Sequence, residues 1–310
     1  MAEGSEIGQT ISELMQGRVL FDEPMSRHTS IGVGGPADIL AFPEGIEELV
    51  RLVSCLREER VAFMPIGNCT NLIVRDGGFR GAMISLRSLQ GVDMRPGAGD
   101  SVFIAAEAGV LLSHIVDLSV RESLSGIEFC AGIPGSVGGS VKMNAGAYGR
   151  EMKDVIHSVT LFNGQGDMRE VSRDGLPFSY RNLDIPAGTT ITGTVLHLTR
   201  GDRGRIEQRV AEILDMRRGK HPLEYRNAGS VFKNLPGYPA GQIIDEIGMK
   251  GTRVGDAQVS EKHGNFIVNL GQATAGDVIS LIEIIRKKVL EQRGIALDTE
   301  VRIVGTGEKA

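Results

Sequence analysis

The sequence has little cysteine, no excess of basic charge and no long apolar run, and each shortage excludes a class of protein. Its three cysteines, Cys55, Cys69 and Cys130, form no Cys-x-x-Cys pair and no even-numbered framework, so a reduced cytoplasmic setting fits best. Residues 1–20 lack the basic start and apolar core of a signal peptide. No apolar run approaches membrane-spanning length, and the six histidines lack the spacing of metal ligands. We therefore predict no membrane partner and no metal.

The charge balance argues against nucleic acid as a partner. Lysine and arginine number 34 against 39 aspartates and glutamates, a formal net charge of −5, whereas a nucleic-acid-binding surface would be basic. Nothing indicates an obligate protein partner. Glycine is abundant instead, with 42 among 310 residues, and it gathers in loops rather than in a repeat. The length allows two domains or three small ones, and 41% hydrophobic residues are enough for sizeable cores.

The most informative stretch is the glycine-rich segment at residues 131–149. It reads Ala-Gly-Ile-Pro-Gly-Ser-Val-Gly-Gly-Ser-Val-Lys-Met-Asn-Ala-Gly-Ala-Tyr-Gly. Hydrophobic Ile133, Val137 and Val141 interleave with the glycines, so the segment is not a linker. Glycines with apolar neighbours let a large flat molecule approach the main chain, whose N–H groups then donate to phosphate or to a heterocycle.

A second loop of the same character lies upstream at residues 65–72. It follows a strand-like run at 61–64 and precedes the apolar run 72–74. Thr70 and two asparagines add side-chain donors to those of the main chain, which suits a phosphate. A single loop of this kind is more often only a structural turn, but the two together favour a ligand site.

Together the two loops resemble the flavin-holding segments of the UDP-N-acetylenolpyruvoylglucosamine reductases, FAD enzymes of cell-wall precursor synthesis. The glycine-rich segment matches the family pattern almost letter for letter. The upstream loop departs from the family's Gly-x-Gly-Ser-Asn, because Cys69 stands in place of glycine and Thr70 in place of serine. Cys69 places a Cβ where the family has none, and Thr70 keeps the hydroxyl.

Three further patches match the family in order along the chain. Tyr180-Arg181 occupies the family's Tyr-Arg position, residues 227–234 match its Gly-Ser-x-Phe-Lys-Asn motif, and residues 297–305 match its C-terminal glutamate motif. The resemblance therefore covers residues 29 to 305, nearly the whole chain. Each of these residues alone would more often be a surface charge, a cap or a turn, and it is the ordered joint match that favours function.

The resemblance implies a reaction in which NADPH reduces FAD and the reduced flavin passes a hydride from N5 to C3 of UDP-N-acetylglucosamine enolpyruvate. An enol ether accepts hydride only if negative charge can flow into its carboxylate, so a cation and a hydrogen-bonding carboxyl must meet that group. Arg181 and Glu300 suit these roles, since a guanidinium grips a carboxylate bidentately. Ser230 would then protonate C2.

The resemblance also implies the binding residues and the subtype. No histidine lies in residues 60–80 or 125–150, so we expect FAD to be held non-covalently. The chain between Arg181 and Lys220 is too short for the family's substrate-capping tyrosine loop, which predicts the shorter subtype. The substrate-binding residues implied are Tyr180, Lys220 and Asn234. The cofactor-binding residues implied are Gly67, Asn68, Cys69, Thr70, Asn71, Gly132, Ile133, Pro134, Gly135, Gly138, Gly139, Asn144, Ala145 and Gly146.

The implied fold class is α+β, with a two-part FAD-binding region of the vanillyl-alcohol-oxidase/PCMH type followed by a separate α+β substrate-binding domain. The predicted domains are residues 1–85, 86–203 and 204–310. Hydrophobic periodicity and turn residues predict the individual elements. The predicted helices are 7–15, 43–60, 111–124, 205–217, 240–247 and 275–292. The predicted strands are 37–42, 61–64, 81–86, 91–94, 101–107, 155–162, 168–171, 190–198, 264–270 and 300–304.

Two other functions stay open on the sequence alone. One is another FAD oxidoreductase of the same architecture, acting on a hydroxy acid or an alcohol. The other is an inactive nucleotide-sugar-binding regulator, which is disfavoured because such a protein should have lost Arg181, Ser230 or Glu300. The colour of the purified protein, and its bleaching by NADPH, would distinguish these possibilities.

Overall fold

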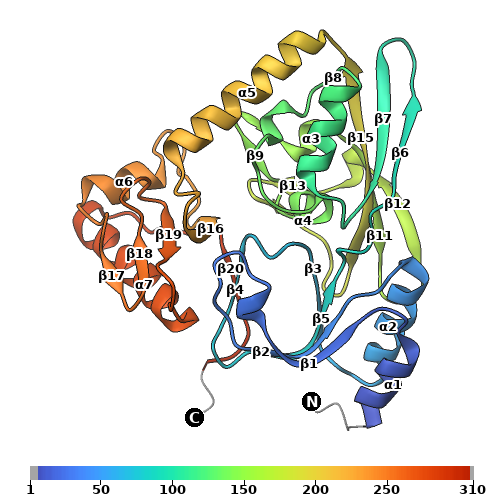
Figure 1. The fold of residues 1–310 in the computed structure, drawn as a ribbon, viewed down its shortest axis with the longest axis horizontal. Coiled ribbons are helices and arrows are strands. Elements are labelled where there is room, and N and C mark those ends of the chain that lie inside the picture. Colours follow the sequence, from blue (N-terminus) through green and yellow to red (C-terminus); the bar gives the residue numbers. More distant parts are fainter. Residues whose placement is uncertain (1–5, 308–310) are drawn as a thin grey trace. The chain divides into compact units, whose positions relative to one another are not determined.

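The computed structural model describes residues 6–307 and separates into two compact units, whose elements are labelled in Figure 1. The first unit contains residues up to 21, 39–68 and 81–216, and the second contains residues 22–38, 69–80 and those from 217 onward. The second unit thus draws two short segments from the N-terminal part of the chain. The division into three domains at residues 85 and 203 stays a prediction.

One hydrophobic core lies between two helices and a sheet of strand order β1-β2-β5-β3. Leu49, Val53 and Leu56 are buried on one face of α2, as their helical spacing predicted. β3 pairs with β5 in parallel, so β5 lies between β2 and β3. The elements are α1 (Glu6–Leu14), β1 (Val19–Pro24), β2 (Pro36–Ala41), α2 (Ile46–Glu58), β3 (Phe63–Ile66) and β5 (Phe79–Ser85).

A second core in the first unit lies against an antiparallel sheet of order β12-β11-β15-β7-β6. Val102, Ile104 and Ala106 of β7 alternate into this core, in the period-2 pattern of a strand with one buried face. Helices α3 and α4 pack against the sheet (Figure 1). The elements are β6 (Val92–Pro96), β7 (Ser101–Glu107), α3 (Leu112–Arg121), β8 (Leu124–Ser125), α4 (Val137–Lys142), β11 (Ile156–Phe162), β12 (Met168–Ser172) and β15 (Thr190–Arg200).

Two small hairpins and a long polar helix complete the first unit. One hairpin, β9–β10, follows α4 and contains the end of the glycine-rich segment. The other, β13–β14, follows β12 and contains the Tyr180-Arg181 pair. Helix α5 buries only Ile206 and Ile213, and the chain passes into the second unit between Met216 and Arg217, within this helix. The elements are β9 (Gly146–Ala147), β10 (Arg150–Glu151), β13 (Phe178–Ser179), β14 (Asn182–Leu183) and α5 (Arg203–Lys220).

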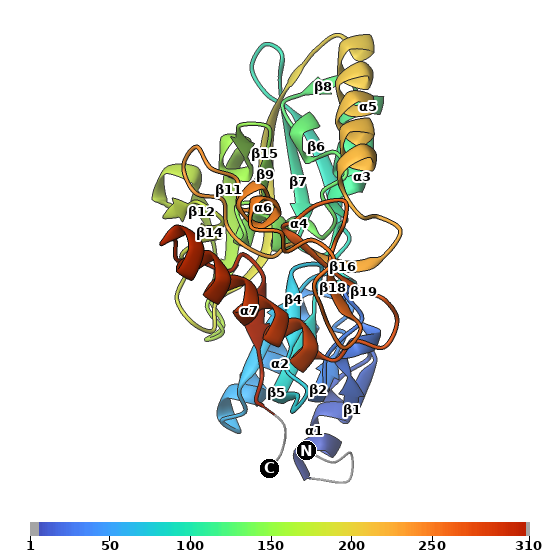
Figure 2. The ribbon, with the colours of Figure 1, turned by 90° about the vertical axis from the view of Figure 1, so that its left-hand side faces the viewer.

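The second unit is built on a sheet of order β16-β19-β18-β17, against which α7 packs (Figure 2). Thr274 caps α7: its hydroxyl accepts from the backbone N of Asp277 at 3.0 Å, and the helix ends at Gly294 with φ +66°. The elements are β4 (Leu72–Val74), β16 (Arg226–Ser230), α6 (Ala240–Glu246), β17 (Arg253–Val254), β18 (Ala257–Val259), β19 (Phe266–Asn269), α7 (Ala275–Arg293) and β20 (Arg302–Val304).

A parallel pair of strands ties residues 72–74 to the C-terminal part of the second unit. β4 and β20 pair in register, with Leu72 opposite Arg302 and Val74 opposite Val304. Both runs were predicted as apolar or strand-like, but their pairing joins residues about 230 positions apart in the sequence. This pairing places the end of the upstream loop beside the C-terminal glutamate motif.

Candidate active site

The upstream loop and the glycine-rich segment approach each other within the first unit. A Cβ built on Gly67 would lie 2.3 Å from the Oγ of Ser136, so a side chain there would require the Ser136 hydroxyl to move. The adjacent side-chain oxygen of Asn68 is buried and has no hydrogen-bond partner within residues 6–307. Leaving a buried amide oxygen unpaired costs about 1–3 kcal/mol. A polar group from a bound molecule would remove that cost, which is the behaviour expected of a ligand loop.

The turn that opens the glycine-rich segment exposes its main chain. Gly132 and Gly135 have φ of +70° and +131°, a region of backbone space that favours glycine. Gly132 and Pro134 are exposed, whereas Val137 directly after them is buried. The segment therefore presents bare backbone to a ligand while its apolar side chains anchor it in the core.

A short helix follows this turn, which the glycine content did not predict. α4 begins at Ser136, whose hydroxyl accepts from the backbone N of Gly139 at 3.4 Å. The backbone N of Gly138 donates to the carbonyl of Ala108 at 2.9 Å, and a Cβ on Gly138 would lie 2.7 Å from that of Ala108. The glycine thus lets the helix begin directly against the end of β7.

Asn144 is fully buried, with a left-handed φ of +40°. Its Nδ2 donates to Glu151 Oε2 at 3.0 Å and to the carbonyl of Ser179 at 2.9 Å, and its Oδ1 accepts from the backbone N of Lys153 at 3.0 Å. The amide is therefore committed to the protein. Contact between residues 144–146 and the cofactor, through the main chain, stays a prediction.

The Tyr180-Arg181 pair forms the loop of the β13–β14 hairpin, and the glycine-rich segment holds this hairpin in place. Lys142 Nζ donates to Asn182 Oδ1 at 3.1 Å, and Arg181 Nη2 donates to the carbonyl of Gly146 at 3.0 Å. The guanidinium also lies 4.7 Å from the centre of the exposed Tyr180 ring. The first unit thus brings the predicted carboxylate-binding arginine to the predicted flavin segment.

In the second unit, Ser230 and Glu300 are brought together through the main chain. Ser230 ends β16, opposite Phe266 and after a register shift in residues 227–230. The backbone N of Glu300 donates to the carbonyl of Val231 at 2.8 Å, and Asn71 Nδ2 donates to the carbonyl of Glu300 at 3.0 Å. Hydrogen bonds therefore connect the main chain directly after Ser230, the main chain of Glu300 and the side chain of Asn71 at the end of the upstream loop.

Asn265 supports this cluster, and the sequence analysis missed it. The residue is 2% exposed. Its Oδ1 accepts from the backbone N of Phe232 at 2.9 Å, and its Nδ2 donates to the carbonyl of Phe232 at 2.8 Å. It therefore holds the chain directly after Ser230. A polar residue next to the apolar run 266–268 was the signal that could have identified it.

The predicted substrate residues Lys220 and Asn234 lie on either side of β16 in the chain. Lys220 is the exposed last residue of α5. Asn234 Oδ1 accepts from the backbone N of Ala240 at 3.0 Å, so this side chain also caps α6. Contacts of both residues with substrate stay predictions. The chain between Arg181 and Lys220 holds β14, β15 and most of α5, which leaves only residues 184–189 and 201–202 as connections.

Two histidines pack on the ring that lies opposite Ser230 in the sheet. The rings of His221 and His263 each lie 4.9 Å from the Phe266 ring, and 5.7 Å from each other. Burial and the nearby Arg217 lower the pKa of His221 from 6.5 to about 4, and burial likewise lowers the pKa of His263. Both rings are therefore neutral at physiological pH.

We expect His221 to make the protein less stable as the pH falls. Between about pH 6.5 and 4 the unfolded chain binds a proton at His221 that the folded chain does not, so the free energy of unfolding decreases with decreasing pH in this window. The loss should be about 1–2 kcal/mol for this partly buried ring. Urea unfolding at pH 7 and pH 4.5 measures it. His221→Phe should flatten the pH dependence, and replacement of the exposed His114 by Gln should not; equal slopes in all three proteins would contradict this assignment.

Cys69 keeps the left-handed backbone expected of the glycine it replaces. Its φ is +53°, and its side chain is 7% exposed. A β-branched residue is strongly disfavoured there. We expect Cys69→Val to destabilise the protein by about 1–3 kcal/mol, as a lower Tm, and Cys69→Gly to retain FAD binding. Cys55→Val, at the buried cysteine of helix α2, is the control; an equal loss of stability in the two valine variants would show that backbone strain is not the cause.

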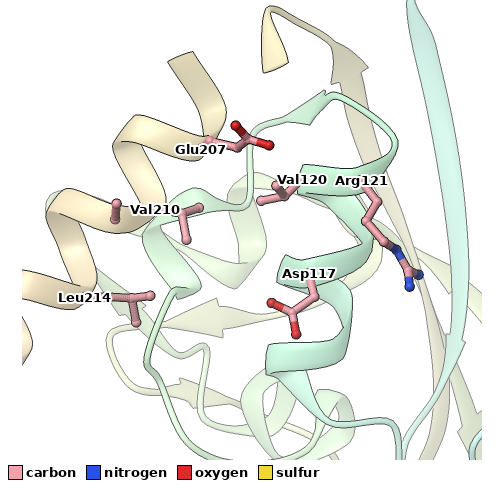
Figure 3. Close-up of a pocket in the computed structure, with 7 residues that line it drawn as sticks. Asp117, Val120, Arg121, Glu207, Val210 and Leu214 are labelled. Atoms are coloured by element: carbon pink, nitrogen blue, oxygen red, sulfur yellow. The ribbon is translucent and has the colours of Figure 1, made fainter. Parts of the chain in front are cut away.

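A hollow of about 360 Å³ lies between α3 and α5, and none of the residues that line it is a predicted site residue (Figure 3). Its apolar lining includes Val120, Val210 and Leu214, and its charged lining residues are Asp117, Arg121 and Glu207.

Within the part of the chain that the structure describes, no helix is long and apolar enough to cross a membrane. Nor do His, Cys, Asp or Glu side chains gather there in groups of three or more that could hold a metal ion.

Known families match the two regions of the chain that carry the candidate site residues. Residues 37–172 match the model of an FAD binding domain, and residues 221–304 match that of the UDP-N-acetylenolpyruvoylglucosamine reductase C-terminal domain. The chain is 52% identical over 299 residues to the UDP-N-acetylenolpyruvoylglucosamine reductase of Syntrophus aciditrophicus, covering 96% of each. It is 43% identical over 293 residues to that of Caldanaerobacter subterraneus subsp. tengcongensis, covering 94% of this chain and 95% of the relative.

A solved structure shows the same architecture. The crystal structure of UDP-N-acetylenolpyruvylglucosamine reductase from Thermus caldophilus is similar to this chain with a TM-score of 0.78 at 37% identity, covering 93% of this chain and 99% of that one. Fold and site together define an FAD-dependent oxidoreductase of the α+β class, with an FAD-binding region followed by a separate C-terminal domain, as predicted. The chain belongs to the UDP-N-acetylenolpyruvoylglucosamine reductase family.

The residues present fit FAD. The buried oxygen of Asn68, which has no hydrogen-bond partner among the described residues, and the exposed backbone at Gly132 lie in the loops predicted to hold it, and the two loops meet at Gly67 and Ser136. No histidine occurs in either loop, which is consistent with non-covalent binding.

Proposed function

We propose that this chain reduces UDP-N-acetylglucosamine enolpyruvate to UDP-N-acetylmuramate with electrons from NADPH, in peptidoglycan precursor synthesis. The observation that carries the proposal is the hydrogen bond from the backbone N of Glu300 to the carbonyl of Val231, which places the main chain of Glu300 beside the residue that follows Ser230. A carboxyl and a hydroxyl carried by adjoining main-chain segments suit a reaction that stabilises a carboxylate and protonates its neighbouring carbon. The family membership supports the substrate and the electron donor.

The charge that develops on the substrate carboxylate is met by Arg181 and Glu300 in this proposal. When bound, FAD supplies the hydride, from N5 to C3 of the enolpyruvyl group. Arg181 offers fixed donors, since its Nη2 is already oriented by the carbonyl of Gly146. Glu300 hydrogen-bonds the same carboxylate in its protonated form, and such contacts strengthen as charge accumulates in the transition state.

Ser230 donates the proton to C2 in this account. Its hydroxyl sits at the end of β16, with the following residues fixed by Glu300 on one side and Asn265 on the other. A hydroxyl is a weak acid, but the carbon it protonates becomes strongly basic after hydride arrives, so the transfer is favourable. Because these contacts hold the chain directly after Ser230, the main chain that carries the hydroxyl is fixed before the substrate binds.

The proposed binding residues fall into one set for the UDP-sugar and one set for FAD. We propose that the UDP-sugar contacts Tyr180, Lys220 and Asn234, and that no nucleic acid or obligate protein partner takes part. The enzyme is proposed to work in the cytoplasm, a location supported by its nucleotide substrates and by its three cysteines, which form no disulfide within residues 6–307. The proposed FAD contacts are Gly67, Asn68, Cys69, Thr70, Asn71, Gly132, Ile133, Pro134, Gly135, Gly138, Gly139, Asn144, Ala145 and Gly146.

The function is tested by steady-state NADPH oxidation with alternative acceptors. We expect a yellow protein whose NADPH consumption depends on UDP-N-acetylglucosamine enolpyruvate and yields UDP-N-acetylmuramate. Hydroxy acids and alcohols should not support turnover. Turnover of these alternatives instead would favour another flavin oxidoreductase, and a colourless protein that binds the UDP-sugar without turnover would favour an inactive regulator.

FAD itself should be released by acid. Precipitation of the purified protein with acid should leave the flavin in the supernatant, because no side chain in either loop offers the histidine attachment found in covalent flavoproteins. Absorbance of supernatant and pellet at the flavin band measures this. Flavin that remains with the pellet after washing would exclude non-covalent binding.

A further inference from the structure

We propose that Glu151 is a positioning residue for Arg181, an inference that rests on the proposed role of Arg181 in binding the substrate carboxylate. Glu151 lies outside the sequence motifs described above. It stands at the end of the β9–β10 hairpin, directly after the glycine-rich segment. The inference depends on contacts within the first unit alone.

A single cross-strand pair holds both ends of the Arg181 guanidinium. Glu151 lies opposite Gly146 in the register of the β9–β10 hairpin. The carbonyl of Gly146 accepts from Arg181 Nη2 at 3.0 Å, and Glu151 Oε1 lies 3.8 Å from Arg181 Nη1. Because Gly146 and Glu151 are paired across the hairpin, the carbonyl and the carboxylate keep a fixed spacing. Each lies next to a different terminal nitrogen of the planar guanidinium.

The carboxylate of Glu151 is itself fixed. Its Oε2 accepts from Asn144 Nδ2 at 3.0 Å and from Lys153 Nζ at 2.7 Å, and its side chain also caps the turn at 152–154. Asn144 is fully buried, so this support cannot move with solvent-exposed loops. With Oε2 so engaged and the side chain only 17% exposed, Oε1 stays directed at Arg181.

Arg181 needs such support because of its place in the chain. It lies in a two-residue hairpin loop with a left-handed φ of +58°. A free arginine side chain has about 2 kcal/mol of rotamer entropy to lose on binding. Holding the guanidinium between Gly146 and Glu151 removes much of that cost before substrate arrives. Lys153 offsets the charge of Glu151, so the positive charge of Arg181 is not cancelled by this carboxylate alone.

A double-mutant cycle on the holoenzyme tests the inference. Glu151→Gln keeps the shape of the side chain and removes its charge. We expect it to slow reoxidation of the reduced flavin by the enolpyruvyl substrate about five- to tenfold, the size of one coupled charged contact. Reduction by NADPH should change by less than about twofold. In an Arg181→Lys background, Glu151→Gln should add less than about twofold to the reoxidation defect.

Controls separate positioning from general damage. Glu128→Gln removes a carboxylate that binds Ser125 and the backbone of Gly126 elsewhere in the same unit, and should alter neither half-reaction. If Glu151→Gln does not fold, Lys153→Met gives the second test. This change removes the positive charge that offsets the Glu151 carboxylate, so Arg181 should be drawn more strongly toward Glu151. The substrate KM should then rise, while the rate of flavin reduction stays unchanged.

Three outcomes would overturn the role of Glu151: equal slowing of both half-reactions, the same factor in the wild-type and Arg181→Lys backgrounds, or an unchanged substrate KM in a folded Lys153→Met protein. Failure of the proposed function looks different. In that case Arg181→Lys alone would leave reoxidation unaffected, or the enolpyruvyl substrate would not reoxidise the wild-type flavin.

Discussion

Ser230→Ala is expected to slow reoxidation of the reduced flavin by the enolpyruvyl substrate by about a hundredfold or more, and to leave reduction by NADPH nearly unchanged. Protonation of C2 belongs only to the reaction with the sugar substrate. The substitution removes one oxygen atom from the end of β16, whose main chain is fixed independently by Asn265 and by pairing with Phe266. The structure therefore predicts loss of an acid without loss of the flavin site.

Stopped-flow absorbance of the flavin resolves the two half-reactions of Ser230→Ala. Ser230→Cys should recover part of the lost rate, because a thiol also donates a proton. Ser260→Ala is a suitable control, since Ser260 is a buried serine of the same unit whose hydroxyl accepts from the backbone of Lys262 and His263. If Ser230→Ala slowed reduction and reoxidation equally, Ser230 would be a structural or binding residue.

Arg181→Lys is expected to slow the same half-reaction by about ten- to a hundredfold. Lysine keeps the charge but has one point donor in place of a planar fork, so it cannot contact Gly146, Glu151 and a substrate carboxylate together. The substrate KM should rise as well, because the carboxylate is bound in the ground state.

Rapid mixing of NADPH-reduced Arg181→Lys enzyme with increasing substrate separates affinity from rate. Replacement of the exposed Arg169 of β12 by lysine makes the same chemical change in the same unit and should have no effect. Wild-type reoxidation by Arg181→Lys would show that the arginine only ties its hairpin to the glycine-rich segment.

Local pattern was sufficient for most of the elements. The stripe of Val278, Ile282, Ile285 and Val289 is buried along α7, and the strand at residues 101–107 has the predicted bounds. The predicted strands 155–162 and 168–171 are confirmed as β11 and β12, which form an antiparallel pair. In each case the determinants lie within a few residues of one another, as periodicity, caps and turns do.

Long-range relations could not be read from the sequence in this way. The pairing of β4 with β20 assigns residues 72–74 to the C-terminal unit, and no local signal marks it. Helix α4 forms despite its glycines because Ser136 caps it and Gly138 packs against Ala108. Asn234, a predicted substrate residue, also caps α6, and Glu151 supports Arg181. Both contacts depend on residues that are not sequence neighbours.

Single-turnover mixing tests the central claim most directly. Enzyme reduced by one equivalent of NADPH without oxygen is mixed with UDP-N-acetylglucosamine enolpyruvate, while flavin absorbance and the sugar products are followed. We predict that the yellow colour returns in one phase and that UDP-N-acetylmuramate forms in the same amount as reoxidised flavin. Flavin that stays bleached in the presence of intact substrate, or that recolours without forming the lactyl ether, would contradict the account.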